Sequence, residues 1–314
     1  MSSIRPSLVR QIAAAATLAT AGVAAACTDT TAPTSLARSF PPSSARPALA
    51  VGGNTIVFQR DSTGDLSSIY TMNDDGTNLT RLRTGERPAW SPDHSKIVFE
   101  ANNTIFIMNA DGTGARALTG VPDDGQASFT ADGSKVVFAH ENLKTGNSDV
   151  FTINVDGTNR KILVKMGNTS VNSPRMSPDG TKLAFEALRR NNNDIVVMDL
   201  STGRRTVVAG GPNHETLPVW SPDSKRLAFR TGILDKGQCI GIVNADGTNL
   251  RDFTNDVAFC STVSWSPDGT ELAFTSITAG STGIYRAPVD VAAAPVRLTT
   301  PSATALDARL SWTR

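Results

Sequence analysis

The sequence is poor in the residues from which metal centres and disulfide frameworks are built. Its 314 residues include only three Cys, three His and two Tyr. His94, His140 and His214 lie far apart in the chain, and no His-x-x-x-His or Cys-x-x-Cys spacing occurs. The Gly-x-Ser-x-Gly motif of the α/β-hydrolase nucleophile is also missing. We therefore expect a protein that is not an enzyme and that uses neither a metal nor a cofactor.

An excess of charge of one sign is also missing. The formal net charge is +1, from 30 Lys and Arg against 29 Asp and Glu, and no basic cluster with interleaved aromatic residues occurs. Such a chain has no electrostatic attraction for nucleic acid or for an anionic membrane surface, so we expect no nucleic-acid partner.

The first 27 residues have the features of an export signal. Arg5 and Arg10 precede a 15-residue apolar stretch, residues 12–26, which is short for a membrane span. Val23-Ala24-Ala25-Ala26-Cys27 resembles a bacterial lipobox, in which the Cys is lipidated and becomes the first residue. We predict a signal peptide over residues 1–27 and a lipid on Cys27. The alternative is an ordinary secretory signal cleaved at the alanine run.

Residues 28–52 have no hydrophobic period and are rich in Pro, Ser and Thr. A segment of this composition cannot bury a core, and we expect it to be a disordered tether. The chain should then be an exported lipoprotein that faces the periplasm or the cell surface, held to a membrane by the lipid anchor only.

A repeat of about 40–45 residues fills residues 53–314, and each unit contains a short apolar strand that ends on Phe. The six copies end at Phe58, Phe99, Phe138, Phe185, Phe229 and Phe274. Five copies follow a turn such as Ser91-Pro92-Asp93, and most of the next strands lead into Asp-Gly-Thr turns such as Asp75-Gly76-Thr77. Asp and Gly in these turns favour hairpins, because Gly accepts the positive φ that closes them. Calcium loops are not expected there, since no copy has the required Glu six residues after the Gly.

Each unit therefore contains four strands, here called A to D, which is the period of a β-propeller blade. The B strands are apolar at consecutive positions, so both of their faces should be buried between neighbouring blades. The first unit has no strand A, whereas Leu310-Ser311-Trp312 matches the strand A segment Val263-Ser264-Trp265. We predict an all-β, six-bladed propeller of four-stranded blades whose C-terminal strand completes the first blade and closes the ring.

These units resemble the repeats of the TolB propeller, and they are also similar to the N-terminal propellers of the prolyl oligopeptidase family. The resemblance rests on the pattern W-S-P-D-G, I-A-F, I-Y-x-M-N-x-D-G-T-N and L-T, which recurs across residues 53–314. The fourth and sixth units depart from it because they lack the Asp-Gly-Thr turn. The resemblance implies the fold, while function has to be argued from the side chains that a fold carries.

The B–C connections vary in length and content, and variable loops on a repeated scaffold are where binding usually resides. We expect a binding face that combines them with the D–A loop around residues 214–215. The candidate residues are His140, Glu141, Glu186, Arg189, Arg190, His214, Glu215, Arg230, Asp235 and Lys236. The alternative for each residue is that it is only a solvated loop side chain.

The function favoured by the sequence is a non-catalytic binding or scaffold propeller, a monomer, that recognises an envelope protein, peptide or glycan. The alternative is a propeller enzyme of lyase or lactonase type with a site at the tunnel mouth, which would need a metal or a compact acid–base group. Cys239 and Cys260 should lie on one side of the ring in adjacent segments. They form a candidate disulfide, against the alternative of two buried thiols.

Overall fold

A computed structural model describes residues 55–62, 66–165, 167, 170–189, 192–232, 240–253, 260–278, 281–301 and 305–313. The predicted signal peptide, Cys27 and tether lie outside these residues and remain predictions. In the described residues no helix is long and apolar enough to cross a membrane.

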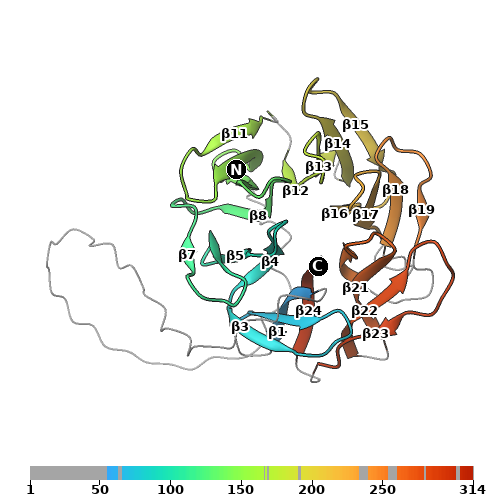
Figure 1. Ribbon diagram of the computed structural model, residues 1–314. Coiled ribbons are helices and arrows are strands. Elements are labelled where there is room, and N and C mark those ends of the chain that lie inside the picture. The colour runs from blue at the N-terminus through green and yellow to red at the C-terminus, as the bar shows by residue number, and fades with distance from the viewer. Residues whose placement is uncertain are drawn as a thin grey trace, which may run out of the picture. The chain divides into compact units, whose positions relative to one another are not determined.

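The described residues form six four-stranded antiparallel sheets arranged around a ring (Figure 1). Strand A of each blade lies at the centre of the ring and strand D at its edge. The first three blades, from strand A to strand D, are β24 (Ala305–Thr313), β1 (Thr55–Ser62), β2 (Ser68–Asn73) and β3 (Thr80–Thr84); β4 (Glu86–Trp90), β5 (Lys96–Ala101), β6 (Thr104–Asn109) and β7 (Arg116–Ala117); and β8 (Asp124–Phe129), β9 (Lys135–Asn142), β10 (Asn147–Asn154) and β11 (Lys161–Val164).

The other three blades repeat this order. They are β12 (Val171–Met176), β13 (Lys182–Arg189), β14 (Asn192–Asp199) and β15 (Arg205–Ala209); β16 (Thr216–Trp220), β17 (Arg226–Arg230), β18 (Ile240–Asn244) and β19 (Arg251–Asp252); and β20 (Cys260–Trp265), β21 (Glu271–Thr278), β22 (Ser281–Pro288) and β23 (Val296–Arg297). The predicted six-bladed propeller is confirmed.

The C-terminal strand closes the ring as predicted. β24 pairs antiparallel with β1, with Trp312 opposite Ile56 and Ser311 opposite Val57. The backbone N–H of Trp312 also donates to Ser264 Oγ of blade 6 (3.0 Å), so the strand is bonded to its neighbours on two sides. The two ends of the propeller chain therefore share one sheet.

The core is divided among the interfaces between blades. The six Phe that end the apolar B-strand segments are at most 1% exposed. Six clusters of buried side chains each join two adjacent blades; one cluster, for example, brings Phe229 of blade 5 together with Val197 of blade 4. Burial of both faces of strand B between neighbouring blades is thus confirmed.

The A–B and C–D turns lie at one end of the ring, which we call the turn end. In the A–B turn of blade 6, Ser266 Oγ donates to Asp268 Oδ1 (2.6 Å) and accepts the backbone N–H of Glu271 (2.9 Å). In the C–D turn of blade 1, Asp75 Oδ1 accepts the backbone N–H of Thr77 (2.8 Å), and Gly76 adopts φ 86°. The same bonds recur in other blades, and they explain why Asp and Gly are repeated in these turns.

The opposite end, which we call the loop end, carries the B–C hairpins and the D–A loops. Several B–C loops are shorter than the sequence suggested, because strands B and C continue beyond the Phe. In blade 3 the ladder runs on through His140 opposite Asp149 to Asn142 opposite Asn147. Polar residues there remain extended because the hairpin pairs their backbone groups.

Candidate functional site

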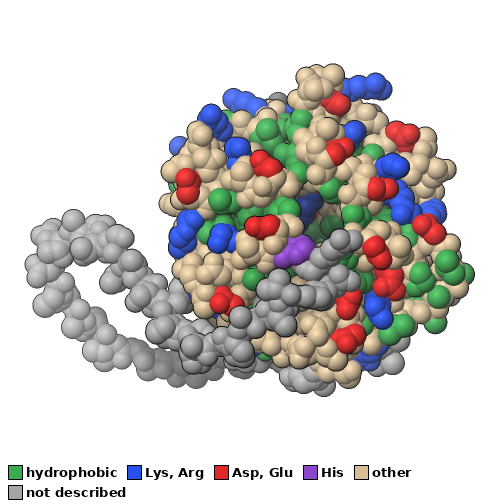
Figure 2. All heavy atoms as spheres, in the orientation of Figure 1, with side chains coloured by type: hydrophobic (Ala, Val, Ile, Leu, Met, Phe, Trp, Pro, Cys, Tyr) green, Lys and Arg blue, Asp and Glu red, His purple; other side chains and the backbone are tan. Residues whose placement is uncertain are grey.

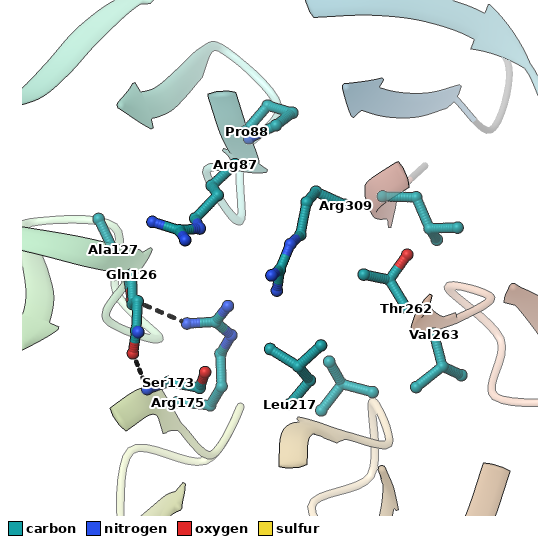
Figure 3. A pocket seen from close by; sticks show the side chains of 12 residues that line it. Arg87, Pro88, Gln126, Ala127, Ser173, Arg175, Leu217, Thr262, Val263 and Arg309 are labelled. Carbon is teal, nitrogen blue, oxygen red and sulfur yellow. Dashed lines mark hydrogen bonds between the residues drawn. The ribbon is translucent and has the colours of Figure 1, made fainter. Parts of the chain in front are cut away.

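The A strands surround a central cavity whose volume of about 490 Å³ includes space open to solvent. Figure 2 shows the hollow at the centre of the ring, with basic side chains visible inside it. Its wall is uneven in chemistry. The cavity is lined by Arg87, Arg175 and Arg309 and also by Leu217, Val263 and Leu310. Figure 3 shows Leu217 beside Arg175 and Val263 on the side away from Arg87.

Each strand A is interrupted near its start by a β-bulge, a feature that the repeat did not reveal. The register with strand B shifts in all six blades, for example between Glu86 and Ala89 in blade 2. Five bulges place a non-glycine residue at positive φ, which costs conformational energy. These residues are Arg87 (47°), Gln126 (60°), Ser173 (48°), Leu217 (57°) and Arg309 (49°).

A polar side chain from the preceding blade satisfies the backbone N–H of several bulges. Gln59 Oε1 accepts the N–H of Arg87 (3.0 Å). Glu100 Oε1 accepts that of Gln126 (2.5 Å), and Glu186 Oε1 accepts that of Leu217 (2.7 Å). All three acceptors directly follow the Phe of strand B, so this position ties one blade to the next.

Blade 3 has Ala139 at that position, and a different residue makes the equivalent bond. The side chain of Gln126 reaches forward, and its Oε1 accepts the backbone N–H of Ser173 in blade 4. The link between blades is thus kept although the acceptor has moved from strand B to strand A.

The three channel arginines differ in how their charge is balanced. Arg87 Nη1 pairs with Glu100 Oε2 (2.6 Å). Arg175 donates to two neutral acceptors, the backbone oxygens of Gln126 (3.0 Å) and Pro174 (2.9 Å). Arg309 makes no ion pair and no hydrogen bond with any residue that the structure describes. Figure 3 shows the three guanidinium groups directed toward a common space.

Burial is the main influence on two of these groups. It lowers the pKa of Arg175 to about 10, an effect that Glu186 opposes and Arg309 increases. Burial also lowers the pKa of Arg309, and the charge of Arg87 adds to this effect. A pKa near 10 still leaves the Arg175 guanidinium protonated at neutral pH. Arg175 and Arg309 are both partly exposed, and neither is paired with a carboxylate among the described residues.

Acidic residues occupy the start of strand A in three blades, at the loop end. Asp307 accepts two hydrogen bonds from Arg60 (2.5 and 2.9 Å) and one from Thr299 Oγ1 (2.6 Å). Asp124 Oδ1 contacts His140 Nδ1 (2.8 Å) and Arg160 Nη2 (3.0 Å). Both carboxylates are buried, and each faces a basic partner.

Glu215 is the third member of this set and differs from the other two. It is 6% exposed, and its Oε2 has no hydrogen-bond partner among the described residues. Burial raises the pKa of Glu215 to about 7, and the charge of Asp194 raises it further. At neutral pH this carboxyl is therefore partly protonated, which is a property of acid–base groups in active sites.

The structure places the predicted binding residues unequally. His140, Glu186 and Glu215 lie where strands A and B meet at the loop end, and the last two are buried. Glu141, His214 and Arg230 are exposed. Glu186 lies within β13 rather than in a loop, because that strand continues to Arg189.

The remaining predicted positions are not described in the structure. Arg190, Asp235, Lys236 and Cys239 lie outside the described residues, as does the side chain of Arg189. Cys260 is buried at the start of β20. Its disulfide with Cys239 stays a prediction.

Sequence reasoning missed Arg87, Glu100, Arg175 and Arg309. The sequence indicates the position of two of them. Arg87 and Arg309 stand three residues before Trp90 and Trp312, which are matching residues of two A strands. Residues that match along strand A face the same channel in a propeller. In the described part of the chain, no group of three or more His, Cys, Asp or Glu side chains is arranged to hold a metal ion.

Comparison with known proteins agrees with this architecture. The profile of the TolB beta propeller domain matches residues 146–313, more than half of the chain. The chain belongs to the TolB β-propeller family. The match begins in blade 3 and runs to the closing strand.

Three solved structures with the same fold are similar to this family member. TolB from Acinetobacter baumannii superposes with a TM-score of 0.71 and 16% identity, over 83% of this chain and 66% of that one, slightly less than two thirds. A putative TolB from Agrobacterium tumefaciens has a TM-score of 0.62 and 16% identity, over 84% of this chain and 100% of that one. An oligogalacturonate lyase in complex with manganese has a TM-score of 0.55 and 18% identity, over 79% and 74%. At these identities the likeness concerns the fold.

Proposed function

We propose that this TolB-family propeller is a non-catalytic binding protein of the bacterial cell envelope, and that its ligand approaches the channel from the loop end. The observation that carries the proposal is the inequality among the blades at that end. The turn end repeats the same A–B and C–D turns in most blades, whereas the loop end holds buried charges that differ from blade to blade. A rigid scaffold with one variable, charged end is suited to recognition.

The envelope location is supported by the family and by the predicted export signal with its lipobox-like Cys27. A protein, peptide or glycan of the envelope is the partner class that such a location offers. Replacing Cys27 with Ser should release the protein from the membrane fraction. Recovery of the wild-type protein in a soluble fraction would contradict the lipid anchor.

The binding proposal is tested by comparing the two ends of the ring. We expect an envelope partner, captured from detergent extract by the full chain, to be lost when His140 and Glu141 are both changed to Ala. A matched double change at the turn end, Asp156→Ala with Asp246→Ala, removes exposed polar groups and should leave capture intact. Equal capture by both variants would argue against recognition at the loop end.

A second candidate is a propeller lyase, favoured by one specific observation. Glu215 carries a buried carboxyl whose pKa is raised to about 7, which is suited to proton transfer near neutral pH. If the protein is such an enzyme, incubation with oligogalacturonate should release unsaturated sugars that absorb in the ultraviolet, and Glu215→Gln should abolish the release. No absorbance change with the wild-type protein would remove this candidate for that substrate.

A further inference from the structure

The strongest unassigned feature of the molecule is the positive charge inside the channel. Arg87, Arg175 and Arg309 line the cavity together, while the charged groups that act on them from neighbouring strands are Glu100, Glu186 and the exposed Arg230. Three cations inside the channel thus face two carboxylates, one of which is already engaged with Arg87 at 2.6 Å.

The two carboxylates are also held in place by the backbone. Glu100 and Glu186 each accept the N–H of a bulge in the next blade, Gln126 and Leu217 respectively. Turning either side chain toward Arg309 would leave a bulge N–H without its acceptor, which costs free energy in a buried site. Moving either carboxylate to neutralise Arg175 or Arg309 would therefore cost free energy.

Arg175 and Arg309 are two partly buried cations without carboxylate partners among the described residues, which is unfavourable for the folded protein. Removing a guanidinium from water is unfavourable unless an anion or a set of acceptors replaces the water. Arg175 has only two backbone oxygens, and Arg309 has no hydrogen bond to the described residues. Arginines retained in such a position are typical of anion-binding sites, because the planar guanidinium matches a carboxylate with two parallel hydrogen bonds.

Another part of the cavity lining is apolar. Leu217, Val263 and Leu310 also line the cavity. Leu217 lies beside Arg175 and Val263 lies on the side away from Arg87, as Figure 3 shows. A ligand that satisfies both parts of the wall carries a carboxylate on an apolar body. A sugar acid fits less well, because its hydroxyl groups would be buried against side chains that cannot hydrogen-bond them.

We propose that the central channel is a carboxylate-binding site, in which Arg175 and Arg309 bind the carboxylate of a small ligand and the apolar wall packs against its hydrocarbon part. The free C-terminal residue of a peptide, with an apolar side chain, has this chemistry. The proposal deepens the proposed function, since it names the ligand class at the same end of the ring, and it rests on that function only for the direction of approach. Arg87 contributes long-range attraction, because its own charge is paired with Glu100.

The probe is N-acetyl-leucine, compared with N-acetyl-leucinamide, added to the purified full chain at constant ionic strength. The melting temperature should rise with the acid and saturate at millimolar concentrations, because a ligand that binds only the folded state stabilises it. The amide should have no effect, since it lacks the charge. Equal effects of acid and amide, or no effect of either, would overturn the proposal.

Variants then locate the site. Arg309→Asn suits the positive φ at this position, because Asn adopts that conformation more readily than most residues, and Arg175→Gln keeps the polar chain. Each should weaken binding of the acid at least tenfold, while the melting temperature without ligand stays the same or rises because a partly buried cation without a carboxylate partner is gone. The matched control is Arg205→Gln on the exposed part of β15, which should change affinity less than twofold. Unchanged affinity in both channel variants would overturn the assignment.

Other anions test the ligand class. Galacturonate and inorganic phosphate should bind more weakly than N-acetyl-leucine, because neither can use the apolar wall. Binding of either one as tightly as N-acetyl-leucine would overturn the apolar-carboxylate assignment. Carboxylate binding without capture of an envelope partner would contradict the proposed function alone, and capture without carboxylate binding would contradict this proposal alone.

Discussion

The two ends of the propeller use acidic residues in opposite ways. At the turn end, the Asp residues are exposed and locally bonded, as in Asp132, whose pKa falls to about 2 because Thr130 and Ser134 donate to it. At the loop end, Glu100, Asp124, Glu186, Glu215 and Asp307 are buried and contact different partners in different blades. The repeated turns, whose hydrogen bonds are local, build the scaffold, and the buried charges, which differ between blades, distinguish the loop end.

Loss of ring closure should have the largest effect, because it disrupts both ends at once. Trp312→Ala removes a buried ring from the interface between blades 6 and 1, and such truncations cost about 3–5 kcal/mol. That is a large share of a typical total stability of about 5–15 kcal/mol. Urea unfolding measures the change.

Trp312→Phe is the matched control for ring closure. The indole N–H of Trp312 is buried and has no hydrogen-bond partner among the described residues. Phe keeps most of the apolar contact and removes this unsatisfied group, so its effect should be much smaller. A Trp312→Ala variant as stable as the wild type would show that β24 does not hold the ring together.

The links between blades are tested by Glu100→Ala. The change leaves the N–H of Gln126 without its acceptor and Arg87 without its partner, and we expect a loss of about 3 kcal/mol. The control is Glu86→Ala, an exposed residue of β4, which should change the free energy of unfolding by less than about 0.5 kcal/mol. Similar losses in both variants would show that the burial of Glu100 has no energetic consequence.

Glu215 provides a test that depends on pH. Its pKa rises from 4.5 to about 7 on folding, so the folded state binds the extra proton and stability is lost as pH rises between these values. Glu215→Gln should remove this slope, worth roughly 1–2 kcal/mol over the interval, since relaxation and hydration reduce the full shift. The exposed Glu141→Gln should leave the slope unchanged.

The sequence revealed the fold much better than the site. Phe58 and its five counterparts, the Ser-Pro-Asp turns and Leu310-Ser311-Trp312 predict blades, period and closure, because each follows a local rule of burial or turn geometry. The bulges of strand A follow no such rule, since Arg87, Gln126, Ser173 and Leu217 have nothing in common as residue types. Their conformation depends on an acceptor from the preceding blade, 26 to 47 residues away in sequence.

For the charged residues at the loop end, the sequence predicted a position in the loops but neither their burial nor their partners. The sequence identified His140 and Glu215 as loop residues. Their different environments, the contact of His140 with Asp124 and the burial of Glu215, arise only in the folded ring. For Arg309, the spacing to Trp312 indicates a place on strand A, but nothing in the sequence indicates that its charge lacks a carboxylate partner. Long-range burial, rather than local pattern, decides which charged side chains lie inside the ring.

The smallest effect on stability is expected from a change in a single turn at the turn end. Asp132 accepts hydrogen bonds from Thr130 Oγ1 (2.6 Å), Ser134 Oγ (2.7 Å) and the Ser134 N–H (3.1 Å). Because the turn is exposed and water replaces some of these bonds, Asp132→Ala should cost less than about 1 kcal/mol at pH 7. The pKa of Asp132 falls from 3.8 to about 2 on folding, so its contribution is present above pH 4 and is lost as pH falls toward 2. Urea midpoints of wild type and variant should therefore differ at pH 7 and converge near pH 2. A difference that persists at pH 2 would show that the carboxylate's charge does not stabilise the turn, and a loss as large as that of Glu100→Ala would remove the contrast between the two ends.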